Sequence, residues 1–346
     1  MHWQDHIDTG RLRAWMLEQG LGEGEITGAH LLGGGTQNLL LRFDYNGRGL
    51  VLRRPPPHLR SNSNETMRRE MRMLEALADS SVPHPRLVAG CPDEDVLGAA
   101  FYVMEPVEGF APVNGLPELH TSDSAIRHRM GLSLVEGITA LGAVDYQAVG
   151  LTGFGKPENY LQRQVSRWRH QLESYAEFPG WSGPRAIPGV EAVANWLERN
   201  QPLSFEPGII HGDYHLGNVM YRHDSGELAA IVDWELTTIG DPLLDLGWLL
   251  ATWPGETPAE DTIEDFRVQP WEGFPSAGEL VEHYRARTHQ DMSGIDWYAV
   301  LACYKLGIIL EGTHARACAG KAPKTTGDQL HASTVALFER AAGWIR

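Results

Sequence analysis

Residues 209–245 gather oxygen-bearing side chains around a hairpin signal. Two apolar, strand-like runs flank a turn at residues 224–226. If the hairpin folds about this turn without a bulge, Asn218 lies opposite Asp233, and Asp213 comes just before it. Mg²⁺ held together with phosphates favours such carboxylate and amide oxygens, because it keeps other coordination positions for water and substrate. The segment therefore predicts a magnesium site with a nearby base.

A glycine-rich turn, Gly-Gly-Gly-Thr-Gln-Asn at residues 33–38, lies between two predicted strands. It could be a plain hairpin loop. Alternatively, its exposed N–H groups and missing side chains would let the backbone lie over phosphates. It contains neither G-x-x-x-x-G-K-[ST] nor a full G-x-G-x-x-G, so the turn alone does not decide between the two.

Glu70 is expected to be buried. The helical periodicity of residues 65–78 puts four apolar side chains on one face, and Glu70 falls in the middle of that face. A buried carboxylate is costly unless a cation pairs with it. The preceding strand offers Arg53 or Arg54, in a pair that is either purely structural or part of a site.

Composition narrows the class of protein. The net charge of −16 argues against a general nucleic-acid binder, because neutralising phosphates needs a basic surface. The three scattered cysteines fit a reducing compartment without a disulfide framework. The first residues hold no apolar signal core, and no apolar run is long enough for a membrane span. We expect a cytoplasmic protein without membrane contact.

The elements that position these residues divide the chain into two parts. Residues 1–106 are predicted to form a smaller β-rich part, and residues 107–346 a larger, mainly helical part, with the boundary at the stiff segment Glu-Pro-Val-Glu-Gly. A length of 346 residues allows each part its own core. Helices are predicted at 9–20, 65–78, 122–141, 160–178, 189–199, 242–252, 276–290, 296–317 and 327–345, and strands at 26–32, 39–43, 50–53, 99–104, 218–222 and 228–234.

The spacing in the central segment is specific. His211-Gly212-Asp213 followed by Asn218 gives H-x-D-x-x-x-x-N, and the hairpin then leads to the sequence Asp-Trp-Glu at 233–235. This order resembles the aminoglycoside phosphotransferase and choline kinase family, which is related to the protein kinases. It is most similar to the phosphotransferase domains fused to some acyl-CoA dehydrogenases, through VLRRPP at 51–56 and GDPLLDLG at 240–247.

The resemblance implies a two-lobed, protein-kinase-like α+β fold, with a small β-rich N-lobe and a larger, mainly helical C-lobe. It implies an ATP- and Mg²⁺-dependent kinase that phosphorylates a hydroxyl group of a small molecule. Such a transfer needs positioned substrates, a metal ion on the phosphates and a base for the hydroxyl proton. By this resemblance, Asp213 is the catalytic base, Asn218 and Asp233 hold Mg²⁺, and Asp245 braces the catalytic loop. The implied nucleotide-binding residues are Gly34, Gly35, Thr36 and Asn38 over the phosphates, Arg53 with Glu70 at the phosphates, and Met104, Glu105 and Val107 at the hinge beside adenine.

Arg53 departs from the kinase pattern, which usually has a lysine on this strand; the first lysine of the chain is Lys156. Arginine can bind a phosphate with two donors and still pair with Glu70, but the two residues are not interchangeable at a fitted site. The subfamily that the chain resembles commonly carries arginine here, so we expect an active enzyme.

Two other functions are considered. His211, Asp213 and His215 have the donors of a Zn²⁺ or Fe site, as in a metal-dependent hydrolase. Alternatively, the chain is a nucleotide-binding pseudokinase module, although the intact set of Asp213, Asn218 and Asp233 argues against it.

The acceptor is expected to lie over the catalytic base, against the C-terminal helices. The candidate wall residues are Tyr214, Trp234, Tyr304, Lys305 and Glu311, although aromatic residues at helical spacing are more often core. The resemblance to dehydrogenase-fused domains suggests a hydroxy acid or a hydroxyacyl thioester as acceptor, by analogy.

Overall fold

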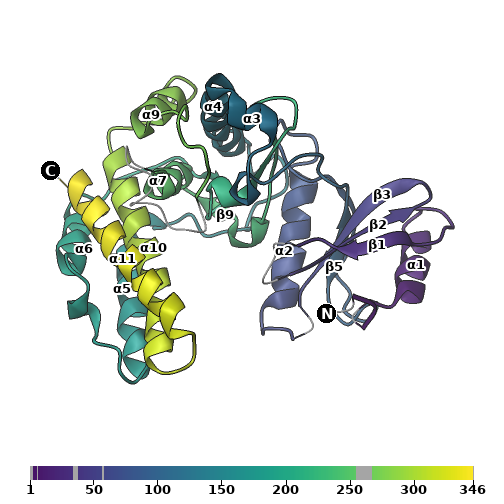
Figure 1. Ribbon diagram of the computed structural model, residues 1–346, viewed down its shortest axis with the longest axis horizontal. Helices are drawn as coiled ribbons and strands as arrows, with labels where there is room; N and C mark the ends of the chain where they lie inside the picture. Colours follow the sequence, from purple (N-terminus) through teal and green to yellow (C-terminus); the bar gives the residue numbers. More distant parts are fainter. Residues whose placement is uncertain (1–2, 6, 34–37, 57, 255–266, 346) are drawn as a thin grey trace.

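The computed structural model describes residues 3–5, 7–33, 38–56, 58–254 and 267–345. Figure 1 shows a sheet-based lobe that carries the N-terminus and a larger helical lobe that carries the C-terminus. This arrangement confirms the predicted α+β class. Gly34, Gly35 and Thr36, expected in the glycine loop, lie outside the described residues.

The N-terminal lobe is built on a five-stranded antiparallel sheet. Asn46 and Gly47 join two of its strands with φ angles of 52° and 71°, the left-handed values that a type I′ hairpin turn requires. The strands are β1 (Thr27–Leu31), β2 (Leu39–Tyr45), β3 (Arg48–Arg54), β4 (Leu87–Cys91) and β5 (Phe101–Met104), in the order β1-β2-β3-β5-β4.

Two helices cover the sheet with different cores. Helix α1 (Thr9–Glu18) contributes Leu12 and Met16 to a core that it shares only with the N-terminal lobe. Helix α2 (Ser63–Ala76) instead contributes Met67 and Leu74 to the large core of the C-terminal lobe. In Figure 1, α2 lies between the sheet and the helical lobe. It therefore connects the two lobes through apolar packing.

Helices dominate the C-terminal lobe, and α10 lies among them with most of its length buried. None of the helices in the described part of the chain has both the length and the apolar character of a bilayer span. The helices are α3 (Glu118–Ser122), α4 (Ser124–Gly142), α5 (Gln164–Ser174), α6 (Val190–Arg199), α7 (Leu243–Thr252), α9 (Ala277–Arg285), α10 (Ile295–Cys318) and α11 (Lys324–Trp344). Short 3-10 turns occur at Trp3–Asp5, Pro112–Asn114, Leu161–Arg163, Tyr175–Glu177, Pro184–Ala186, Leu216–Asn218 and Trp234–Leu236.

Three predicted helices are shorter or divided. The segment predicted as one helix at 122–141 begins at Ser124, because Asp123 has an extended backbone and accepts a hydrogen bond from the N–H of Ala125 as a cap. The helix predicted at 160–178 is α-helical only over Gln164–Ser174, with 3-10 turns on both sides. The helix predicted at 276–290 ends at Arg285.

The central hairpin forms, but its predicted register is wrong. Its strands are β7 (Val219–Tyr221) and β8 (Leu228–Ile231), and the N–H of Val232, not of Asp233, reaches the carbonyl of Asn218 at 2.9 Å. A bulge shifts the pairing, because Met220 lies opposite Ala230 whereas Tyr221 lies opposite Leu228. A second small sheet pairs β6 (Gly208–Ile210) with β9 (Thr238–Gly240).

Candidate active site

The loop that carries Asp213 follows strand β6, and Asp245 of helix α7 holds its backbone in place. The carboxylate of Asp245 accepts hydrogen bonds from the N–H groups of His211 at 2.6 Å and Gly212 at 2.8 Å. Asp245 is 2% exposed, and burial raises the pKa of its carboxyl group. Asp245 was predicted to brace this loop, and its two hydrogen bonds fix the backbone next to Asp213.

Asp213 and Asn218 lie side by side at the end of this loop. Nδ2 of Asn218 donates to the carbonyl of Asp213 at 2.9 Å and to its Oδ2 at 3.0 Å. Burial opposes the charge on Asp213, but the hydrogen bond with His215 and nearby positive charges, including Lys305, lower its pKa to about 2. Asp213 is therefore a charged carboxylate at neutral pH, able to accept a hydrogen bond from a hydroxyl.

Arg53 joins the two lobes at the site. Its Nε lies 2.8 Å from Oε2 of Glu70, and its Nη2 lies 2.8 Å from Oδ1 of Asp233. Glu70 is 1% exposed and also accepts a hydrogen bond from Tyr102 at 2.8 Å. The predicted buried pair of Glu70 with an upstream arginine is thus present, and Arg53 is the partner. Burial opposes the charge on Arg53, but the carboxylates of Glu70 and Asp233 raise its pKa above the usual range.

Three carboxylates converge beside Arg53. One oxygen each from Glu70, Asp233 and Glu235 lie within 4.8 Å of one another. Asp233 adopts a left-handed backbone with φ 66°, which turns the chain sharply after β8. Burial, with the charges of Asp233 and Glu70, raises the pKa of Glu235. A divalent cation relieves such repulsion, and this oxygen donor set fits Mg²⁺.

Glu235 is the residue that the sequence reasoning missed as a possible metal ligand. Its signal was the alternation in Asp-Trp-Glu at 233–235. The 3-10 turn Trp234–Leu236 buries Trp234 and leaves Asp233 and Glu235 near each other. Asn218, by contrast, contacts Asp213 rather than lying opposite Asp233.

A cavity of about 320 Å³ lies beside Glu235 and along the N-terminal end of α2. Asn38, from the end of the glycine segment, and Glu235 both line it, although they come from different lobes. Ser63 and Thr66 of α2 complete the wall on one side. The cavity therefore lies between Asn38, at the end of the glycine segment, and Glu235 of the carboxylate cluster.

The predicted hinge continues from β5. Met104 ends that strand and pairs with Val51 of β3. The N–H of Glu105 donates to the carbonyl of Arg86 at 2.9 Å, and its side chain pairs with Arg48 at 2.6 Å. The amide of Glu105 is thus already used within the protein, so an adenine ring would have to use other backbone groups of this segment. Val107 and Glu105 also line a cavity of about 490 Å³ with the turn between β7 and β8.

The profile of the phosphotransferase enzyme family matches residues 28–280, which is more than half of the chain. The chain belongs to the phosphotransferase enzyme family. A protein from Ralstonia eutropha assigned as an aminoglycoside phosphotransferase has a crystal structure similar to this one, with a TM-score of 0.78 and 30% identity over 97% of this chain and 98% of that chain. The phosphotransferase and this relative therefore share the fold across nearly their whole lengths.

Curated relatives are larger proteins. The phosphotransferase is 31% identical over 273 residues to human acyl-CoA dehydrogenase family member 11, an alignment that covers 77% of this chain and 33% of that protein. It is 28% identical to mouse acyl-CoA dehydrogenase family member 10, over 87% of this chain and 29% of that protein. The chain thus spans about a third of the length of these relatives. A mutant of aminoglycoside phosphotransferase APH(4)-Ia, solved as a ternary complex with AMP-PNP and hygromycin B, has the same fold at 14% identity, with a TM-score of 0.59 and coverage of 94% of this chain and 98% of that chain.

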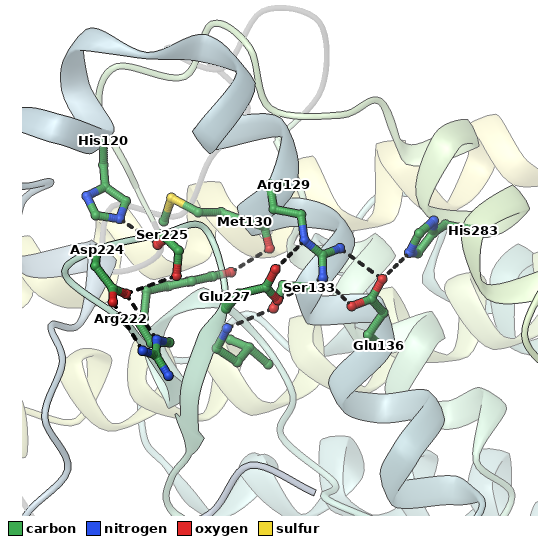
Figure 2. Close-up of polar contacts among 12 residues, drawn as sticks. His120, Arg129, Met130, Ser133, Glu136, Arg222, Asp224, Ser225, Glu227 and His283 are labelled. Carbon is green, nitrogen blue, oxygen red and sulfur yellow. Dashed lines mark hydrogen bonds and ion pairs between the residues drawn. The ribbon is translucent and has the colours of Figure 1, made fainter. Parts of the chain in front are cut away.

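The hairpin that follows the catalytic loop is fixed to helix α4 of the phosphotransferase. Figure 2 shows Arg129 of α4 between the carboxylates of Glu227 and Glu136, and His283 on the far side of Glu136. Arg129 contacts Glu227 through two bonds of 2.7 Å each. Ser133 of α4 also accepts a hydrogen bond from the N–H of Leu228 at 2.8 Å. These bonds hold the bulged register and so set the position of Asp233 at the hairpin's end.

Four of the five predicted acceptor-wall residues are buried: Tyr214, Trp234, Tyr304 and Glu311 have at most 3% exposure. Lys305 is only partly buried, and its Nζ donates to the carbonyl of Gly212 at 3.1 Å. The ammonium group lies 4.2 Å from the centre of the Trp248 ring, a cation–π contact. Burial lowers the pKa of Lys305 to about 8, although Asp213 and Asp245 oppose the shift. Lys305 is therefore a cation next to the loop that carries Asp213.

The hydrolase cluster of His211, Asp213 and His215 does not assemble. The groups of histidine, cysteine and acidic side chains that converge within the described ranges are two others, and neither includes these three residues. Nε2 of His211 lies 3.0 Å from the carbonyl of Val232, and Nδ1 of His215 accepts from the N–H of Gly217 at 3.0 Å. Both histidines therefore use a ring nitrogen to hold the loop together.

Proposed function

We propose that this phosphotransferase moves the γ-phosphoryl group of Mg·ATP to a hydroxyl group of a small anionic acceptor, a hydroxy acid or a hydroxyacyl thioester. Asp213 orients the acceptor hydroxyl and accepts its proton. Asp233, with Glu235 and Asn218 nearby, holds Mg²⁺, which would neutralise charge on the phosphates. Arg53 contacts the phosphates, and the segment 104–107 borders the adenine ring.

The observation that carries the proposal is the arrangement around Asp213. This carboxylate has a pKa of about 2, lies on a loop braced by Asp245, and is bonded to Asn218 at 3.0 Å. Phosphoryl transfer to a hydroxyl needs such a positioned acceptor for the proton, together with a metal and cations on the phosphates. For the second requirement, Asp233 and Glu235 of the same lobe converge with Glu70 and Arg53 of the other lobe, which supports the proposal.

Asp213→Asn tests the base. We expect the rate of phosphoryl transfer to fall by at least about 10²-fold, because a positioned base contributes roughly that factor, while nucleotide affinity stays nearly unchanged. Asp79→Asn, at an exposed position beyond the end of helix α2, is the matched control and should retain full activity. Retained turnover in Asp213→Asn would disprove the base, and ATP binding without transfer to any acceptor in the wild type would favour the pseudokinase module.

The anionic acceptor is inferred from the charges beside the catalytic loop. Lys305 lies against Gly212, and the exposed Arg167 is close enough to lower the pKa of Lys305 further. Arg167 also lies over the Trp168 ring, 5.4 Å from its centre. Two positive charges on this side favour a carboxylate or a phosphate-bearing acceptor and disfavour a polycation. The acyl-CoA dehydrogenase relatives point to the same class of acceptor by analogy.

A screen of acceptors by nucleotide consumption tests this class. Hydroxy acids and hydroxyacyl thioesters should be phosphorylated, and aminoglycosides should not. Arg167→Gln should raise the KM for the anionic acceptor and leave the KM for ATP unchanged, whereas the exposed Arg199→Gln should change neither. Turnover of aminoglycosides with no turnover of any anionic acceptor would contradict the proposed acceptor but not the phosphoryl transfer itself.

A further inference from the structure

A second group of metal-type ligands lies away from the carboxylates of the active site, between helices α10 and α11. One carboxylate oxygen of Glu311 and one ring nitrogen each of His314 and His331 lie within 4.8 Å of one another. Glu311 and His314 share a face of α10, and His331 comes from α11. Metal sites in helical proteins are commonly built in this way, from side chains of facing helices.

Glu311 is the residue that needs a cation here. Its side chain is 0% exposed, and its oxygens accept from Nε1 of Trp181 at 2.7 Å and contact Nδ1 of His331 at 2.8 Å. An indole is neutral, and an imidazole carries a positive charge only when it is protonated. A buried carboxylate therefore has no permanent cation among these two partners, which is costly. A divalent ion would supply that charge.

The two histidines are arranged as metal ligands usually are. Their rings stack with centres 4.5 Å apart, and one nitrogen of each ring lies within 4.8 Å of the other and of a Glu311 oxygen. Nδ1 of His314 lies 3.2 Å from the carbonyl of Gly327, and a neutral His314 that donates this hydrogen bond keeps the lone pair on Nε2. Metal-binding histidines commonly donate their second nitrogen to a backbone carbonyl in this way, which fixes the ring.

The distances allow the group to close on an ion. Ligands about 2 Å from a tetrahedral zinc ion lie about 3.3 Å from one another. Nδ1 of His331, now 2.8 Å from Glu311, must move slightly away from it, and the other pairs, all within 4.8 Å, must close by at most about 1.5 Å. The histidine side chains can move, because His314 is 18% exposed and His331 is 28% exposed. Sγ of Cys318 lies 3.5 Å from Nε2 of His314, just outside the three-residue group.

We propose that Glu311, His314 and His331 bind one Zn²⁺ ion, with the fourth coordination position open to water. Zinc fits better than magnesium, because two imidazoles and one carboxylate are typical zinc ligands whereas Mg²⁺ prefers oxygen. Binding replaces the hydrogen bond between His331 and Glu311: a neutral His331 keeps its proton on Nε2, whereas a protonated His331 releases one proton to solvent. The ion joins α10 to α11, and α10 also carries Lys305, which contacts the catalytic loop.

The test is a titration of the chelator-treated full chain with zinc alone, in the presence of excess Mg²⁺. It is made in an Asp233→Asn background, so that zinc does not enter the carboxylates of the active site. We expect one equivalent of zinc per chain, measured by calorimetry and by metal analysis after gel filtration. His331→Ala and Glu311→Gln should each lower zinc affinity at least about tenfold, the lower bound of the effect expected even for a second-shell partner.

His170→Ala is the matched control, because His170 is an exposed histidine on helix α5, and this variant should bind zinc as the parent does. Zinc should raise the Tm of the parent and of the His170→Ala variant but not the Tm of the His331→Ala variant. Circular dichroism of the metal-free variants checks that they fold. Substoichiometric binding in the parent, or equal affinity in the folded His331→Ala variant, would overturn the proposal in favour of a simple Glu311–His331 ion pair.

Discussion

Nη2 of Arg53 lies 2.8 Å from Oδ1 of Asp233, while Nε of the same guanidinium lies 2.8 Å from Oε2 of Glu70. One side chain of the sheet thus contacts both helix α2 and the segment that follows β8. The planar fork of arginine makes this double contact possible, because its donors point in several fixed directions at once. A lysine ammonium at the same position is a single point of charge.

Arg53→Lys should therefore weaken the site without abolishing it. We expect the KM for ATP to rise several-fold and kcat/KM to fall by about tenfold, because one ammonium replaces two directed contacts. Arg53→Met should cost about 3–5 kcal/mol of unfolding free energy, since it leaves Glu70 buried without its cation. Steady-state kinetics and urea unfolding measure these effects. Unchanged kinetics in the lysine variant would show that the fork is not needed.

Glu235→Gln should weaken the use of Mg²⁺. Removing one of three converging charges lowers metal affinity, so the Mg²⁺ concentration for half-maximal activity should rise at least several-fold at fixed ATP. Glu75→Gln, an exposed change on helix α2, should leave the magnesium dependence as it is. An identical magnesium dependence in Glu235→Gln would exclude Glu235 from the metal site.

Lys305 predicts a pH limit on activity. Its pKa of about 8 means that its positive charge is present below pH 8 and is lost above it. With an anionic acceptor, kcat/KM should fall as the pH rises past this value. Lys305→Arg keeps its charge, so its kcat/KM should stay level to higher pH. Lys305→Met has no charge, so its kcat/KM should be low both below and above pH 8. A decline above pH 8 that is the same in Lys305→Arg would assign it to another group.

Asp241 predicts a pH dependence of stability. Burial raises the pKa of Asp241 from 3.8 to about 6, against the hydrogen bonds from Tyr298 and Leu243. The folded protein then binds the proton more tightly than the unfolded chain, so its contribution to stability is full below pH 3.8 and is lost as the pH rises through about 6. The loss amounts to about 3 kcal/mol.

Asp241→Asn removes this titration. The unfolding free energy of the variant relative to the wild type, measured from pH 4 to pH 7, should therefore rise up to about pH 6 and then level off. A constant difference between the two proteins across this range would show that Asp241 does not titrate there.

The sequence predicted what depends on local periodicity. Glu70 falls on the apolar face of its helix, and the strand before it offered only neighbouring arginines, so the buried ion pair with Arg53 could be anticipated. The register of the central hairpin could not be, because the bulge depends on contacts of Glu227 and Leu228 with helix α4, which is distant in sequence.

The residues that line the acceptor site were harder to predict than the hairpin register. Helical spacing does not distinguish a tyrosine that lines a cleft from one inside the core, and Tyr304 and Tyr214 lie inside it. Glu235 was overlooked because its proximity to Glu70 arises only when the lobes come together. Contacts between residues distant in sequence thus decided what the sequence did not show, within the helical lobe for the hairpin and the tyrosines and between the lobes for Glu235.

Helix α2 is attached to the helical lobe by more than its apolar face. Arg69 donates to the carbonyls of Phe154 at 2.9 Å and Thr237 at 3.1 Å, and Arg72 donates to the carbonyl of Gly150 at 2.7 Å. These hydrogen bonds attach α2 to the lobe that contains Asp213, whereas one face of the sheet packs in a separate core with α1. A movement of the sheet relative to the helical lobe would therefore have to occur at its interface with α2, where Tyr102 donates to Glu70 at 2.8 Å. The ion pair of Arg53 with Glu70 spans the same interface between the sheet and α2. It would therefore resist any movement of the sheet that accompanies nucleotide release.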